Sequence, residues 1–117
     1  MDHRDAIIRY YEAFRVRDRE SLRALLTPDF LFSSSFGEYR DRDAMIEEIW
    51  PGVGQAWASK LRIFGDGPEF MVRYEHEIAP GVERPPMTMA EYVRFDGDRI
   101  AEIEVFVGRP ASSAARP

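Results

Sequence analysis

The spacing of apolar residues changes partway along this chain of 117 residues. Up to about residue 50, large apolar side chains recur at helical spacing, as at Ile7, Tyr10, Tyr11 and Phe14. From Ser59 onward, apolar and polar residues alternate, which is typical of half-buried strands. Helices followed by a run of strands predict an α+β fold.

Three helices are predicted in the first half. The first covers residues 2–16, the second begins at a cap formed by Asp18, and the third follows a cap at Asp41. The second helix ends at Thr27-Pro28-Asp29, because proline disfavours helix in the residue before it. A short strand over residues 30–36 and a turn at Gly37 separate the second helix from the third.

Four antiparallel strands are predicted in the second half, over residues 59–64, 69–78, 87–95 and 99–107. Asp96-Gly97-Asp98 is a strong hairpin signal between the last two. We expect one domain over residues 1–108, in which a strongly curved sheet wraps the helices. The small, polar residues of 109–117 predict a disordered tail.

Composition narrows the classes of function. The chain has no cysteine, which excludes disulfides and thiolate chemistry. A net charge of −5 argues against nucleic acid and anionic membrane surfaces as partners. Two distant histidines and the lack of a glycine-rich phosphate loop lead us to expect no metal and no cofactor. With neither a signal peptide nor a long apolar run, we expect a soluble, cytoplasmic protein.

The last two strands set the faces of the sheet. Ile103, Val105 and Val107 alternate with charged or aromatic residues, so we assign them to the face toward the helices. A three-residue turn then places Glu91 opposite Ile103, facing inward. Pairing residue 78 with residue 87 places Tyr74 opposite Glu91, although a slip of one residue would reverse that strand.

This register gathers a polar cluster on an apolar inner wall: Glu91, Tyr74 and His76, with Tyr10 facing them from the first helix. Burial should raise the pKa of Glu91, which marks it as a functional candidate. The alternative is structural, with Glu91 as a paired carboxylate, His76 as a strand-end residue and Tyr10 as a core aromatic. The other residues expected to line this pocket are Trp50, Trp57, Ser33, Met89, Val93 and Ile103.

Several local sequences resemble one family. These are the helix at 8–14, the break at Asp18, the segment Thr27-Pro28-Asp29-Phe30 and the closing hairpin at 92–100. Over residues 4–108 they resemble SnoaL-like domains of the cone-shaped nuclear transport factor 2-like superfamily. The superfamily includes ketosteroid isomerase, scytalone dehydratase, limonene epoxide hydrolase and polyketide cyclases. The resemblance implies the fold, which hosts many functions.

Ketosteroid isomerase is the closest mechanistic template. It uses an Asp base on the first strand, with a Tyr and a protonated Asp that stabilise the oxyanion. The resemblance places the tyrosine at Tyr10 and the protonated acid at Glu91. The base falls at or near Ser33, where this chain has only serines.

We therefore expect a small, largely apolar organic molecule as ligand. As an enzyme, the chain would catalyse cofactor-free isomerisation, dehydration or cyclisation, with Glu91 and Tyr10 polarising an oxygen and His76 moving a proton. The missing first-strand base keeps an alternative open, a non-catalytic ligand-binding or partner domain. The outer sheet face around Tyr92, Arg94 and residues 102–106 predicts a homodimer.

Overall fold

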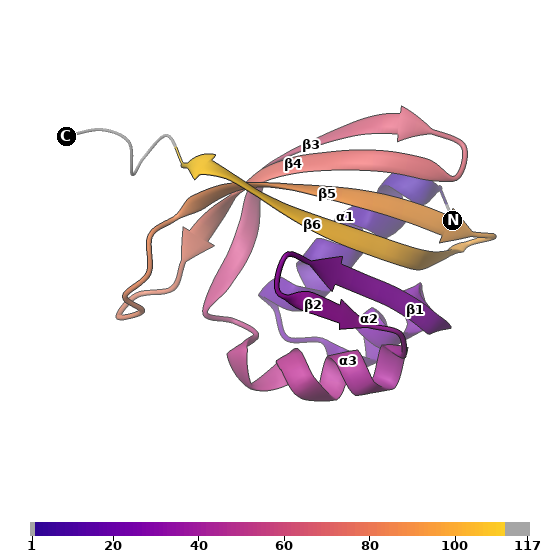
Figure 1. Ribbon diagram of the computed structural model, residues 1–117, viewed down its shortest axis with the longest axis horizontal. Coiled ribbons are helices and arrows are strands. Elements are labelled where there is room, and N and C mark those ends of the chain that lie inside the picture. The colour runs from indigo at the N-terminus through magenta and orange to yellow at the C-terminus, as the bar shows by residue number, and fades with distance from the viewer. Residues whose placement is uncertain (1, 112–117) are drawn as a thin grey trace.

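The computed structural model describes residues 2–111 and confirms the α+β architecture (Figure 1). In that range the order is α1 (His3–Arg15), α2 (Arg19–Leu25), β1 (Leu26–Ser34), β2 (Gly37–Tyr39), α3 (Arg42–Ile49), a 3₁₀ turn (Trp50–Gly52), β3 (Ala56–Asp66), β4 (Glu69–Ile78), β5 (Met87–Asp96) and β6 (Arg99–Pro110).

Aspartates begin all three helices. The side chain of Asp2 accepts from the Arg4 backbone N–H, and those of Asp18 and Asp41 accept from the N–H groups three residues further on. These bonds satisfy donors that a helix start leaves free, and the negative charge suits the positive end of the helix dipole. The predicted caps at Asp18 and Asp41 are confirmed.

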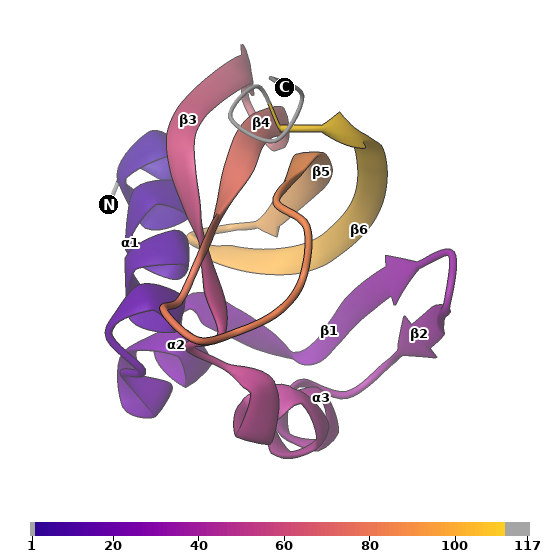
Figure 2. The same cartoon turned by 90° about the vertical axis from the view of Figure 1, so that its left-hand side faces the viewer.

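The strands form one sheet in the order β2-β1-β6-β5-β4-β3. β1 runs parallel to β6 and the other neighbours are antiparallel. Figure 2 shows the sheet bending around α1, with α2 and α3 beneath its β1 side. The sheet does not close, so the fold is an open cone whose concave face holds the core.

The first strand differs from the prediction at both ends. It begins at Leu26 and continues through Pro28. The proline is tolerated because β2 pairs only with the last three residues of β1, and because the pairing of β1 with β6 is irregular between Leu26 and Leu31. It ends at Ser34, where a turn leads into β2, a strand too short to leave an alternating pattern. Phe36 lies in that turn and is 94% exposed.

The turn between β5 and β6 is shorter than predicted. Asp96 pairs with Arg99, so the turn contains only Gly97 and Asp98, and the predicted three-residue turn is wrong. Gly97 has a φ of 61°, which the first central position of a type II′ turn requires. This shorter turn displaces the pairing by one residue.

An extra residue in β6, Ala101, displaces the pairing by one more. Glu91 therefore lies opposite Val105 instead of the predicted Ile103. Since strand faces repeat every two residues, a displacement of two leaves Glu91 on its predicted inner face. Val107, however, is exposed, because β6 extends beyond the helices there (Figure 1).

The pairing of β4 with β5 is also displaced by two residues. Tyr74 lies opposite Met89, and Val72 takes the predicted place of Tyr74 opposite Glu91. Tyr74 and Glu91 are thus diagonal neighbours on one face, still within reach of a long side chain. Val72 and Tyr74 are buried, as predicted, and His76 is half-buried.

Two side chains at the start of α1 attach it to the sheet. The His3 ring stacks on Phe95, and its two nitrogens lie 2.7 and 2.8 Å from the carbonyl oxygens of Gly67 and Gly97. Arg4 donates to two carbonyls of β3. These contacts connect α1 to both hairpin turns and fix its position across the concave face.

The final strand passes the expected domain boundary at residue 108. β6 runs to Pro110, and the Ala111 N–H donates to the Pro86 carbonyl. Residues 112–117 of the expected disordered tail lie outside the described residues. Within residues 2–111, none of the helices has the length and apolar character needed to cross a membrane.

Candidate functional site

A cavity of about 170 Å³ lies between α1 and the concave side of the sheet. Its walls come from α1, the end of α3, and strands β1, β3, β4 and β5. The lining residues are Tyr10, Tyr11, Phe14, Phe32, Ile49, Ala56, Trp57, Ala58, Tyr74, His76 and Glu91.

Glu91 is the acidic residue of this cavity, and it is 5% exposed. Its Oε1 accepts a hydrogen bond of 2.8 Å from Tyr11 Oη, and its Oε2 accepts from Tyr74 Oη. Each carboxyl oxygen therefore has one tyrosine donor. Two donors on two oxygens match the needs of a carboxylate and offset part of the cost of burying it.

Burial raises the pKa of Glu91 above its ordinary value, and the bonds from Tyr74 and Tyr11 oppose that rise. Desolvation is the larger effect because the charged form loses its water and gains only two hydroxyl donors. The predicted rise is therefore confirmed in direction. A carboxylate in this environment is a stronger base than one in water.

The tyrosines are held neutral. Burial, followed by the charge of Glu91, raises the pKa of Tyr10, Tyr11 and Tyr74 well above the ordinary value. Tyr11 and Tyr74 donate hydrogen bonds to Glu91 and keep their protons. Within residues 2–111 no hydrogen-bond partner is found for the Tyr10 hydroxyl, which leaves it available to a bound molecule.

His76 and Trp57 are half-buried and lie toward the open end of the cavity. The His76 ring packs 5.7 Å from that of Tyr74, centroid to centroid. Burial, with the charge of Arg84 as a smaller cause, lowers the pKa of His76. The imidazole is therefore neutral near neutral pH, with one donor and one acceptor nitrogen.

The structure brings Glu91, Tyr10, His76, Tyr74 and Trp57 together around one cavity, as the sequence predicts. The remaining residues predicted to line it lie elsewhere.

Ser33 follows the cavity residue Phe32, and successive side chains of a strand point to opposite faces. Met89, Val93 and Ile103 are buried in the core instead of bordering the cavity. Trp50 lies under two guanidinium groups, with the Cζ atoms of Arg17 and Arg19 at 5.2 and 5.6 Å from the centre of its ring.

Tyr11 is the functional candidate that the sequence analysis missed. It shares the apolar face of α1 with Tyr10, and adjacent helix positions differ by only about 100°. Helical spacing alone cannot tell which of two neighbouring tyrosines reaches a given strand. The sequence signal that could have identified Tyr11 is the pair of adjacent tyrosines on a helix that faces a buried carboxyl group.

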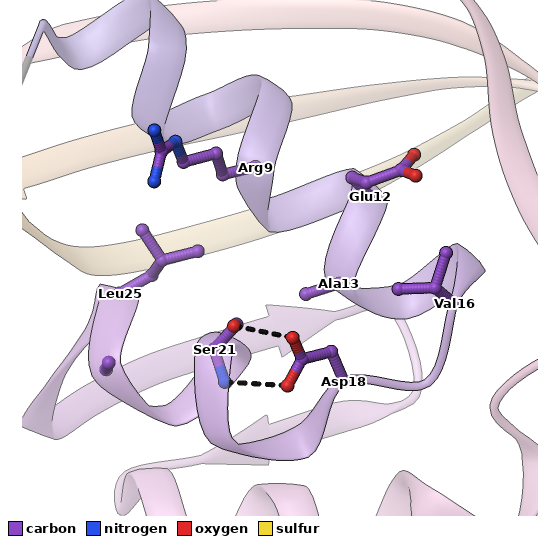
Figure 3. Close-up of a pocket in the computed structure, with 8 residues that line it drawn as sticks. Arg9, Glu12, Ala13, Val16, Asp18, Ser21 and Leu25 are labelled. Carbon is purple, nitrogen blue, oxygen red and sulfur yellow. Dashed lines mark hydrogen bonds between the residues drawn. The ribbon is translucent and has the colours of Figure 1, made fainter.

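A second cavity, of about 340 Å³, lies in the groove between α1 and α2 (Figure 3). Except for Arg9, its charged side chains are already paired within residues 2–111. Asp18 accepts from the backbone N–H and hydroxyl of Ser21, and Glu12 pairs with Arg15. Although this groove is larger, it offers fewer free reactive groups than the cavity at Glu91.

Metal ligands are not clustered in this part of the chain. Among residues 2–111, no three His, Asp or Glu side chains come together as a metal ion would need. The cavity at Glu91 supplies one carboxyl group, one imidazole and three phenols.

Comparisons with known proteins agree with this fold. The model of the SnoaL-like domain family matches residues 7–103. A search of curated proteins finds no match to the chain.

Three solved structures illustrate the structural similarity. A candidate ketosteroid isomerase from Kribbella flavida is 14% identical, with 98% of this chain and 82% of that one covered and a TM-score of 0.80. A candidate polyketide cyclase from Sinorhizobium meliloti is 22% identical, with coverages of 87% and 94% and a TM-score of 0.74. An LEH-like epoxide hydrolase from M. tuberculosis is 18% identical, with coverages of 89% and 80% and a TM-score of 0.77.

At these identities the three structures establish the shared fold alone. The family model extends over most of the chain. The chain therefore belongs to the family of SnoaL-like domains.

Proposed function

We propose that the cavity at Glu91 binds a small, largely apolar organic molecule and moves a proton on it without a cofactor. One observation carries the proposal: a carboxyl group buried at the inner end of an aromatic cavity, with a tyrosine hydroxyl on each oxygen. Isomerisation, dehydration and cyclisation are the reaction classes that such a group serves.

The hydrogen bonds lead us to assign different roles to these side chains. Tyr11 and Tyr74 are positioning residues, since each donates a hydrogen bond to Glu91. Glu91 then acts as the base, with a basicity increased by burial. Tyr10 has a free hydroxyl that can donate to an oxygen of the substrate as negative charge develops there.

This division differs from the roles expected from sequence. There, Glu91 polarised an oxygen and His76 moved the proton. Because Glu91 accepts a hydrogen bond on each carboxyl oxygen, we now assign it the proton transfer. His76, neutral and half-buried, is suited to exchange protons between the cavity and water.

In the simplest reaction, Glu91 removes a proton from the carbon next to a carbonyl group. The electron pair of the C–H bond forms a carbon–carbon double bond, and the π pair of the carbonyl group moves to its oxygen, which accepts a hydrogen bond from Tyr10. Return of the proton to another carbon completes an isomerisation. The similar structures named for a ketosteroid isomerase and a polyketide cyclase support chemistry of this class in this fold.

The test uses cyclohex-3-enone, a one-ring ketone whose conjugation proceeds through an enolate. Proton NMR in D₂O would follow deuterium entry next to the carbonyl and formation of the conjugated isomer. We expect catalysis by the wild type, a loss of about 100-fold or more in Glu91→Gln and a loss of about 100-fold in Tyr10→Phe.

Two matched variants serve as controls. Glu77→Gln changes an exposed carboxylate of β4, and Tyr39→Phe changes a tyrosine outside the cavity. Both should keep the wild-type rate. A Glu91→Gln protein with the same exchange rate as the Glu77→Gln control would refute the assigned role. Binding of the ketone without exchange would indicate a non-catalytic ligand-binding domain.

We further propose that the chain forms a homodimer through the outer face of the sheet. Phe64, Met71 and Phe106 lie on that face and are between 40% and 49% exposed. Arg94 and Glu102 form an ion pair beside them. Apolar side chains bordered by paired charges suit a self-complementary interface.

Sedimentation velocity tests the homodimer. The wild type should sediment as a dimer at tens of micromolar, and Phe106→Glu should be a monomer. A wild type that stays monomeric throughout that range would contradict the proposal.

A further inference from the structure

We infer that the molecule bound at Glu91 is uncharged, contains about one ring, and enters with its oxygen first. The inference rests on the proposed function only in taking this cavity as the working site. It adds the size, charge and orientation of the ligand, which the fold itself does not determine.

The volume limits the size of the ligand. The cavity measures about 170 Å³, close to the roughly 150 Å³ of an engineered protein cavity that binds benzene. Drug-sized ligands occupy cavities of about 300 Å³ or more. A single six-membered ring therefore fits, whereas a fused pair of rings would have to displace wall residues that belong to the packed core.

The lining determines the charge. Of the eleven lining residues, none is Lys or Arg, and the one carboxyl group is Glu91. An anionic ligand would place a second negative charge beside Glu91 without a cation to pair with either. Arg84, whose charge affects His76, is exposed on the loop before β5 and does not line the cavity.

Burial determines the orientation. Tyr10, Tyr11, Tyr74 and Glu91 are all less than 9% exposed, whereas the apolar lining residues are half-buried. The polar groups thus lie at the inner end, and the aromatic walls of Phe14 and Phe32 lie nearer the opening. A ligand oxygen reaches the free Tyr10 hydroxyl and the remaining lone pairs of Glu91 only by going in first.

Three probes separate the charge of the ligand from its size: phenol, benzoate and 2-naphthol. Calorimetric titration of the wild type should show binding of phenol. Benzoate should bind about 30-fold more weakly, because its carboxylate meets that of Glu91. 2-Naphthol should bind about 10-fold more weakly than phenol, although its larger apolar surface would favour it if burial alone decided affinity.

The variant Glu91→Gln tests the charge argument separately. Removing the carboxylate should bring benzoate to within about threefold of phenol and should leave 2-naphthol weak. The exposed Glu77→Gln variant should keep the wild-type order. If Glu91→Gln does not fold, the wild-type series alone decides the inference.

Three results would overturn the inference: benzoate binding as tightly as phenol, 2-naphthol binding more tightly, or no probe binding at all. The proposed function fails differently. Selective phenol binding without exchange in cyclohex-3-enone would refute catalysis and leave the ligand class standing. Catalysed exchange together with tight benzoate binding would support catalysis and refute the inferred ligand class.

Discussion

Replacing Glu91 with glutamine should change the pH dependence of stability. Folding raises the pKa of this carboxyl group above its ordinary value of 4.5. The folded protein therefore holds the proton more tightly than the unfolded chain. The resulting stabilisation is fully present below pH 4.5 and is lost as the pH rises through the pKa of the folded state.

The magnitude follows from two effects. In the wild type, each whole pH unit between the folded and unfolded pKa values corresponds to about 1.4 kcal/mol of unfolding free energy. Glutamine does not titrate. Its NH₂ group, however, cannot accept a hydrogen bond from one of the two tyrosine hydroxyls, and this loss lowers the free energy of unfolding by about 1 kcal/mol at any pH. The variant should be the less stable protein at acid pH, and its difference from the wild type should shrink as the pH rises and Glu91 ionises.

Urea unfolding from about pH 4 to about pH 8 measures this difference, with similar m-values as the two-state check. Glu77→Gln, on the exposed side of β4, is the control whose difference from the wild type should stay flat. A wild-type minus Glu91→Gln difference that does not fall with rising pH would contradict a raised pKa of Glu91 in the folded protein. It would mean that Glu91 ionises in the fold as easily as in water.

Four further changes test other parts of the structure. Tyr74→Phe removes one donor from the buried carboxyl group and should cost about 1–2 kcal/mol in urea unfolding. His3→Ala removes two carbonyl contacts and a ring stack, so it should lower unfolding free energy by about 1–2 kcal/mol. Gly65→Ala should be more destabilising than Gly37→Ala, because an added Cβ would lie 2.5 Å from a backbone oxygen at Gly65 and in open space at Gly37; melting temperatures would compare them.

The faces of the sheet could be predicted from sequence because strands repeat every two residues. Both hairpin registers were displaced by two residues, so Glu91 and Tyr74 stayed on the predicted face. The displacement in the last hairpin combines a shorter turn with the extra Ala101. Neither the shorter turn nor the extra residue leaves a pattern in the sequence. Either one alone would have displaced the register by one residue and moved Glu91 to the opposite face of the sheet.

The cavity could be predicted only in part. Glu91, Tyr74 and His76 follow from alternation along two strands, but the depth of the cavity depends on how α1 lies across them. That placement depends on contacts between distant residues, such as His3 with both hairpin turns. For the same reason sequence did not show that Tyr11, and not Tyr10, donates to Glu91.

A crystal structure of the protein soaked with phenol would show whether the cavity at Glu91 holds a ligand of one ring. We expect a ring between Phe14 and Phe32, with its oxygen within hydrogen-bond distance of Tyr10 Oη and Glu91. Phenol bound instead in the groove between α1 and α2, with side chains filling the space at Glu91, would contradict it.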